Sequence, residues 1–70
     1  MDLKSWRLDR KLTQAVAGEL LGLSQPTLAK IEAGGQWPTP ETIALIERGT
    51  NGSVTANDIL AHYQAAQEAA

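Results

Sequence analysis

The chain has 70 residues, a formal net charge of −2 and no cysteine. This length allows one domain with a small core, and the lack of cysteine excludes disulfides and thiolate metal sites and fits a reducing cytoplasm. No apolar run approaches the ~20 residues that a membrane-spanning helix needs, and we expect no signal peptide. The negative net charge argues mildly against a nucleic-acid partner, although where the Lys and Arg residues lie matters more than their sum.

The first predicted helix runs from Asp2 to about Lys11. Leu3 and Trp6 are spaced to share one face of it, and the Asp2 carboxylate suits the positive end of the helix dipole. We interpret Trp6 as a core residue whose indole N–H lies near the surface.

The segment from Leu12 to Gly34 predicts two short helices joined by a tight turn. Thr13 and Ser24 are good N-caps because a hydroxyl oxygen can accept an otherwise unpaired backbone N–H. Gly22 can adopt the left-handed conformation that closes the first of these helices, and Gly34, or Gly35 after it, closes the second. This order of helix, glycine-containing turn and helix is a helix-turn-helix.

The apolar residues of this segment indicate one buried side. Gly18 falls where the two helices come closest, and only a very small residue fits there. The residues that can point to the inner side of the bent unit are Ala17, Leu21, Leu23, Leu28 and Ile31. Val16 and Leu20 share a different face, so we expect them either to contact a second chain or to be covered by the first or last helix.

Two further helices are predicted after the loop of residues 34–38. Thr39 caps the first of them, with Pro40 in the first helical position and Ile43 and Ile46 in the core. Thr55 caps a short last helix, with Asp58 in the reciprocal capping-box position. Val54 and Ile59 should close the core, and residues 64–70 form a helical extension or a frayed tail after a domain of residues 1–63.

The sequence offers little for catalysis. His62 is the only histidine, and we expect it to be an exposed helix residue. There is no phosphate-binding loop, dinucleotide-binding turn or nucleophile elbow. We therefore expect no enzyme, no cofactor, no metal site and no small-molecule ligand.

The motifs of this segment resemble the Cro/CI-type helix-turn-helix family, the lambda-repressor-like DNA-binding domains of the XRE class. The residues that carry the resemblance are Thr13-Gln14, Gly18, Gly22, Ser24-Gln25, Ile31-Glu32 and Gly34. The resemblance implies an all-α bundle of about five short helices, with the helix-turn-helix at the second and third. It also implies a cytoplasmic protein of bacterial or phage origin.

The resemblance assigns functions to individual residues. Arg7 is expected to pair with Glu32, and Gln14 is expected to reach a DNA phosphate. The helix that starts after Ser24 is expected to enter the major groove. The residues expected to contact DNA are Gln14, Ser24, Gln25, Pro26, Thr27, Lys30, Gly35 and Gln36. For Trp37, we expect either anchoring of the loop or stacking on the DNA backbone.

The function that follows is sequence-specific binding of double-stranded DNA by a transcriptional regulator, expected to be a repressor acting as a homodimer. The expected dimer surface comprises Val16, Leu20, Val54, Ile59, Leu60 and Tyr63. One alternative is an antitoxin-type interaction module that binds DNA secondarily, although few residues are spare for gripping a toxin. Another is a helical scaffold in which the helix-turn-helix serves packing alone.

Overall fold

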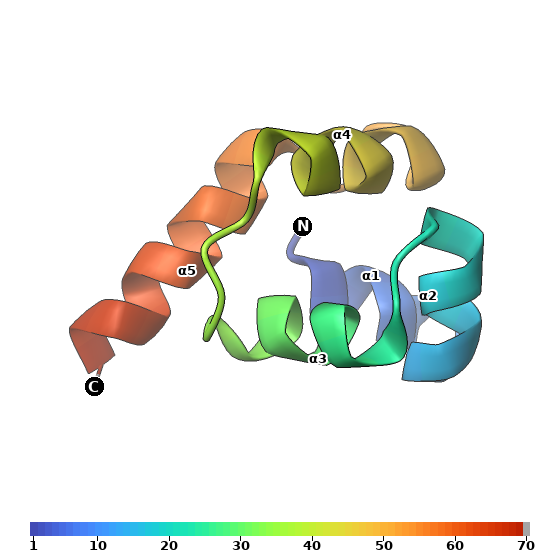
Figure 1. Cartoon of the computed structure of the whole chain (residues 1–70), viewed down its shortest axis with the longest axis horizontal. Coiled ribbons are helices and arrows are strands. Elements are labelled where there is room, and N and C mark those ends of the chain that lie inside the picture. Colours follow the sequence, from blue (N-terminus) through green and yellow to red (C-terminus); the bar gives the residue numbers. More distant parts are fainter. Residues whose placement is uncertain (70) are drawn as a thin grey trace.

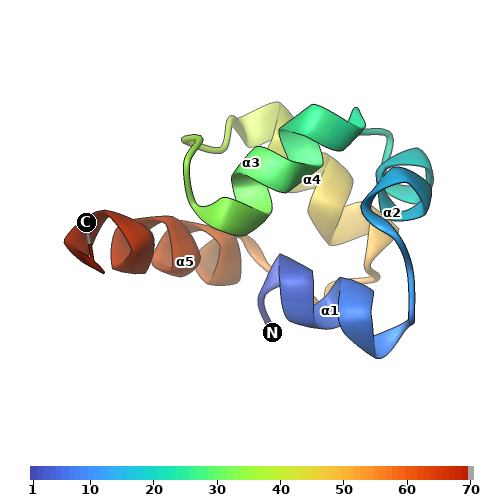
Figure 2. The same cartoon turned by 90° about the horizontal axis from the view of Figure 1, so that it is seen from below.

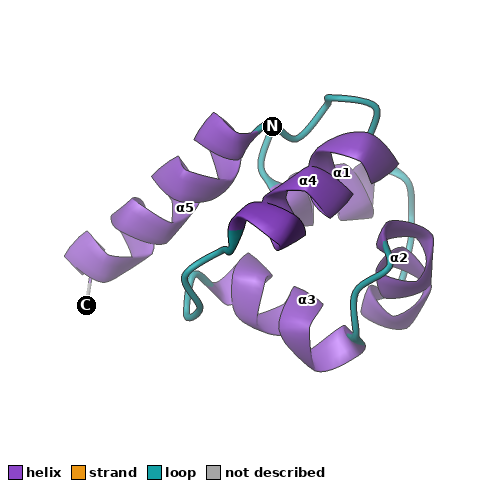
Figure 3. Ribbon diagram, turned by 45° about the horizontal axis from the view of Figure 1, so that its top comes forward, coloured by secondary structure: helices purple, strands orange, loops and turns teal. Residues whose placement is uncertain are grey.

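A computed structural model describes residues 1–69, and this part of the chain contains five helices and no strand (Figure 3). The helices are α1 (Leu3–Asp9), α2 (Gln14–Leu21), α3 (Gln25–Ala33), α4 (Pro40–Gly49) and α5 (Ala56–Ala69). The predicted all-α fold class is confirmed. Within the described residues, no helix is both long and apolar enough to span a bilayer.

Capping side chains start the helices where the sequence predicts. Asp2 accepts the backbone N–H of Ser5 at 2.7 Å, and the hydroxyls of Thr13, Ser24 and Thr39 each accept an N–H three residues onward. At α5 the box is reciprocal, because the Thr55 N–H donates to Asp58 (3.0 Å) and the Asp58 N–H donates to Thr55 (3.2 Å). Each cap pairs donors that the first helical turn leaves free.

The ends of the helices depend on left-handed residues. Gly22 and Gly34 have φ angles of 79° and 73° and close α2 and α3, as predicted. The first helix ends two residues earlier than predicted, at Asp9, because Lys11 itself adopts a positive φ of 57°. A positive φ at a residue other than glycine is uncommon and is hard to predict from the sequence.

The helix-turn-helix lies at one side of the molecule. Figure 1 shows α3 along the bottom with α2 at its right, α4 across the top and α5 sloping down at the left, and Figure 2 views α1, α2 and α3 from below. The turn is tight because Gly18 packs against backbone: a Cβ on Gly18 would lie 2.6 Å from the carbonyl oxygen of Leu23. The predicted need for a very small residue here is confirmed.

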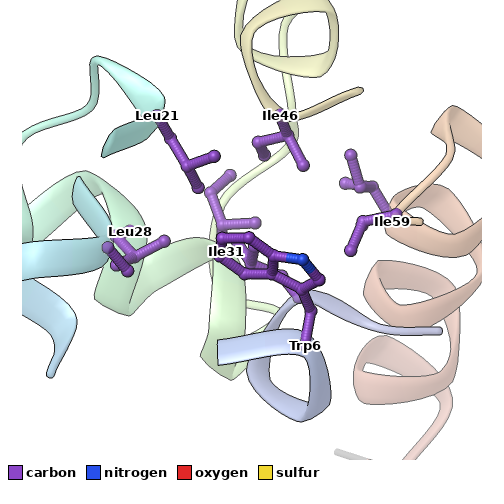
Figure 4. Close-up of a cluster of buried hydrophobic side chains, with 9 residues drawn as sticks. Trp6, Leu21, Leu28, Ile31, Ile46 and Ile59 are labelled. Atoms are coloured by element: carbon purple, nitrogen blue, oxygen red, sulfur yellow. The ribbon is translucent and has the colours of Figure 1, made fainter. Parts of the chain in front are cut away.

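All five helices contribute to the core, and Figure 4 shows their side chains converging around Trp6. The buried apolar residues are Leu3, Trp6, Ala17, Leu21, Leu28, Ile31, Ile46, Val54 and Ile59. The predicted surface position of the Trp6 indole N–H is wrong: Nε1 is buried and has no hydrogen-bond partner among residues 1–69. The Arg10 guanidinium lies over the indole ring, 5.1 Å from its centroid.

A buried hydroxyl joins α4 to the segment before α5. The Thr50 Oγ1 donates to the Ile46 carbonyl at 2.8 Å and accepts the Val54 N–H at 3.1 Å. Thr50 is thus a satisfied polar core residue, although the sequence indicated only a break in the chain here.

Candidate nucleic-acid interface

One face of α3 is turned away from the core. Leu28 and Ile31 are buried, whereas Gln25, Pro26 and Lys30 are exposed. Thr27 is half-buried, and its hydroxyl oxygen accepts a hydrogen bond from the Ser24 hydroxyl at 2.9 Å. The first two turns of α3 therefore present an amide, a proline ring and an ammonium group to the surroundings.

Two alanines complete this face and were not singled out in the sequence. Ala29 is half-buried and Ala33 is exposed. They follow Gln25 at steps of four residues, the spacing that places side chains above one another on a helix. That spacing is the signal that could have found them. Because alanine side chains are short, the surface of the second half of this face lies close to the helix backbone.

An ion pair holds the C-terminal half of α3 to α1. Arg7 Nε lies 2.6 Å from Glu32 Oε2, and Arg7 Nη2 lies 3.1 Å from Glu32 Oε1. Arg7 Nη1 also donates to the Leu12 carbonyl at 2.9 Å. Both side chains of the ion pair are almost buried. The hydrogen bonds that Arg7 donates to Glu32 raise the pKa of Arg7 above its ordinary value, so the guanidinium stays charged.

Gln14 joins the same carboxylate from α2. Its Nε2 donates to Glu32 Oε1 at 3.2 Å. Its side chain is half-buried rather than fully extended into solvent. The amide that was expected to reach a phosphate thus helps to position Glu32.

The loop after α3 differs in part from the expectation. The Gly35 N–H donates to the Lys30 carbonyl at 3.0 Å in the motif that closes α3, so it is not a free donor for a DNA backbone. Gln36 is half-buried. Trp37 packs edge-on against Tyr63 of α5, with the ring centroids 5.0 Å apart, so the loop is anchored on the domain.

Helix α5 docks on the end of α3. His62 Nε2 lies 2.6 Å from the Glu32 carbonyl, and Gln67 Nε2 donates to the Gly34 carbonyl at 3.0 Å. The expectation that His62 is exposed is therefore wrong: it is half-buried against α3. These side chains occupy carbonyls that the last turn of a helix leaves unpaired.

The residues expected at a dimer surface fall into two groups. Val54 and Ile59 are buried within the single chain, so they offer no side-chain surface to a second chain. Val16 and Leu20 are 44% and 61% exposed, so neither is covered by another helix within residues 1–69. Leu60 and Tyr63 are half-buried.

Helix α2, the tight turn after Gly22 and the capped helix α3, whose inner face is packed in the core, define a helix-turn-helix domain. A family model described as "Helix-turn-helix" matches residues 3–56. The chain belongs to the XRE, or Cro/CI-type, helix-turn-helix family, and its five helices fit the lambda-repressor-like fold. No curated protein and no solved structure matches the chain. Membership indicates a DNA-binding transcription regulator, in a family that is typically non-enzymatic.

Proposed function

We propose that this chain is a sequence-specific transcriptional repressor that binds a palindromic operator as a homodimer, with α3 in the major groove. The observation that carries the proposal is the outward face of α3. Its residues Gln25, Pro26 and Lys30 are exposed, while Leu28 and Ile31 on its inner face are buried in the core. A helix held in this way fits the major groove, where its N-terminal residues meet base edges.

The chemistry of this face limits how bases are read. Gln25 can pair with adenine through its amide, and Lys30 can reach guanine or a phosphate one turn further on. Pro26 offers only apolar contact, as to a thymine methyl group. Because this set makes few hydrogen bonds to bases, part of the specificity comes from the shape and deformability of the DNA.

A dimer follows from the size of the module, because one small domain buries limited surface on DNA. Two copies on a palindrome would place their half-sites about one helical turn apart, ~34–36 Å. The exposed Val16 and Leu20 support a contact through α2, and of the α5 residues expected at the dimer surface Leu60 and Tyr63 remain partly accessible. Repression follows where the operator overlaps a promoter, since the bound dimer excludes polymerase.

The antitoxin alternative has less support. It needs a segment that is free to grip a toxin, and the structure uses much of the last helix against its own domain. Gln67 is bound to the Gly34 carbonyl. The bond ties the C-terminal half of α5 to α3.

The proposal is tested by selecting a DNA site from a random pool and measuring affinity for it. Gln25→Ala should cost about 1–3 kcal/mol and relax the preference at one base pair, because it removes a base contact. Lys30→Ala should weaken binding as well. Arg48→Ala is the control, because Arg48 lies in the last turn of α4, across the molecule from α3 (Figure 1). Failure to select any site would reject the proposal.

A further inference from the structure

The loop that joins α4 to α5 contains the pair Asn51-Gly52 (Figure 3). Both residues are exposed, and both have a positive φ, 54° at Asn51 and 79° at Gly52. Asparagine amides are among the thermolabile groups of proteins. A glycine that follows one makes it more reactive, because glycine has no Cβ to keep its backbone nitrogen away from the amide. The proposed function gives this pair no role.

The reaction that this pair can undergo needs only the chain and water. The Gly52 backbone nitrogen loses its proton to a base in the solvent and attacks Cγ of the Asn51 amide with its free electron pair. The new bond closes a cyclic succinimide, and the bond from Cγ to the amide nitrogen breaks, so that this nitrogen takes up a proton from water and leaves as ammonia. Water then opens the ring at either carbonyl, which gives aspartate or isoaspartate.

In the folded chain the attacking nitrogen is already engaged. The Gly52 N–H donates to the Glu47 carbonyl at 2.8 Å, and the Asn51 N–H donates to the Arg48 carbonyl at 3.2 Å. These two bonds close α4, with Asn51 in the left-handed position that glycine usually occupies. A backbone N–H that is bonded to a carbonyl is directed away from the Asn51 side chain and gives up its proton less readily. The cap of α4 therefore blocks the nucleophile.

We propose that Asn51-Gly52 is a site of spontaneous deamidation, which the C-terminal cap of α4 keeps unreactive and which local opening of that cap activates. This inference goes beyond the proposed function and does not depend on it. The cap is held by hydrogen bonds rather than by packing around Gly52, because a Cβ on Gly52 would meet nothing within 4 Å.

The side chain that resists opening of the cap is Thr50. It is buried, its hydroxyl donates to the Ile46 carbonyl at 2.8 Å, and the same oxygen accepts the Val54 N–H at 3.1 Å. Thr50 thus ties both sides of the Asn51-Gly52 pair to the core. Its contacts offer a way to loosen the loop without changing the two reacting residues.

The product of the reaction cannot restore the cap. Isoaspartate adds a methylene group to the backbone before Gly52, which displaces the Gly52 N–H from the Glu47 carbonyl. Either product places a carboxylate at the negative end of the α4 dipole and makes the formal net charge one unit more negative than −2. Because ammonia is lost, the change is irreversible, and the converted fraction increases with the time that the cap has spent open.

The first test compares the folded chain with the chain unfolded in guanidinium chloride, at the same pH and temperature. Mass spectrometry of the tryptic fragment that follows Arg48 measures conversion at Asn51. The reaction should be about tenfold or more slower in the folded chain, because its rate follows the open fraction. Asn57 is the internal control, since the Asp58 side chain hinders attack there. Equal rates in the two states, or no conversion in the unfolded chain, would overturn the proposal.

The second test asks whether the opening is local. Thr50→Val removes the hydroxyl and should accelerate conversion of the folded chain but not of the unfolded chain, whereas Thr50→Ser keeps the hydroxyl and should retain the parent rate. Thr39→Ala is the matched control, because it removes the cap at the other end of α4 and lowers stability away from the loop. If Thr39→Ala accelerates conversion as much as Thr50→Val does, or if Thr50→Val has no effect, local activation is overturned.

A third measurement examines the product. Asn51→Asp carries the new charge on an ordinary backbone, and Asn51→Gly suits the left-handed position without a reactive amide. The isoaspartate form, separated by chromatography, should unfold at a lower urea concentration than Asn51→Asp, and Asn51→Gly should be at least as stable as the parent. An isoaspartate form as stable as the parent would show that the cap can be restored, contrary to the proposal.

Discussion

Glu32 shows how one side chain can connect most of this domain. Its carboxylate accepts hydrogen bonds from Arg7 of α1 and Gln14 of α2, and its backbone carbonyl lies against His62 of α5. A buried carboxylate is stable only when its charge is compensated and its oxygens are bonded. The position of α3 therefore depends on three other helices at a single residue.

Breaking this ion pair should be costly. Arg7→Met leaves Glu32 buried without a counter-charge, which is expected to cost about 3–5 kcal/mol, comparable with the whole stability of a domain this small. The double variant Arg7→Met/Glu32→Leu should recover most of that loss, because two apolar groups replace the pair. Urea unfolding followed by circular dichroism measures both variants. A single variant as stable as the parent would contradict the buried pair.

Two helix caps should make the fold sensitive to acid. The Ser5 N–H lowers the pKa of Asp2 below its ordinary value of 3.8, and the Thr55 N–H, with the Met1 ammonium group, lowers that of Asp58. The unfolded chain binds the proton more readily, so this stability is present above pH 3.8 and is lost as the pH falls through the lowered pKa values.

Asp58→Asn tests this pH dependence. The variant should lose stability at neutral pH, and its stability should change less than that of the parent as the pH falls below 3.8. Thermal unfolding over this pH range provides the comparison, with Asp2→Asn as a second variant. Parallel curves for parent and variants would exclude a contribution from the caps.

Some of these residue roles were accessible from the sequence and others were not. The resemblance pointed to the pairing of Arg7 with Glu32. The contacts of Gln14 and His62 with Glu32 could not be foreseen, because they depend on how α2 and α5 lie against α3. The periodicity of apolar residues within one helix carries no information about how two helices are placed against each other.

At the scale of elements, the packing of α5 against the C-terminal end of α3 fixes the position of that end. A Cβ on Gly34 would collide with the Ala66 side chain, whereas a Cβ on Gly52 meets nothing within 4 Å. Both glycines have a positive φ. The two positions therefore separate the cost of backbone strain from the cost of displacing α5.

Gly34→Ala and Gly52→Ala form a matched pair for this purpose. Gly52→Ala should lose about 1 kcal/mol, from the left-handed conformation alone. Gly34→Ala should lose more, and adding Ala66→Gly should restore only the excess. Chemical denaturation measures all three. Equal losses at the two glycines would mean that α5 does not pack on α3 in solution.

The sequence predicted the starts of the helices better than it predicted how the helices and loops pack against one another. Four of the five helices start at a predicted cap, because a cap is local chemistry between residues three positions apart, and the first starts after Asp2, which was expected only to suit the helix dipole. The Gly35 N–H was expected to face DNA and instead closes α3. The sequence had placed Val54 and Ile59 both in the core and at the dimer surface, and their burial leaves only the core role.

At the scale of the whole molecule, the negative net charge hides an uneven distribution. Lys4 and Lys30 are exposed on and beside the outward side of α3, and the Glu32 carboxylate is neutralised by Arg7. A sum over the chain could not show this. Among the large apolar side chains of residues 1–69, Leu20 is the most exposed.

Dimer formation through α2 predicts a specific loss. Leu20→Glu should weaken self-association tenfold or more, because a symmetric contact uses the residue twice and each buried Leu contributes about 1.5–3 kcal/mol. Leu8→Glu is the control, since Leu8 of α1 is 54% exposed but lies outside the expected surface. Sedimentation of each variant gives the dissociation constant, and equal effects of the two changes would reject this surface.

The convergence of three helices on Glu32 also bears on how the domain opens. Detaching α1, α2 or α5 alone would remove a partner of Glu32, so partial opening is penalised at every step. The backbone amides of α3 should then exchange with deuterium only when the entire chain unfolds. Helix α3 would share the global free energy of unfolding although it lies at the molecular surface, and under the proposed function it would reach DNA already rigid.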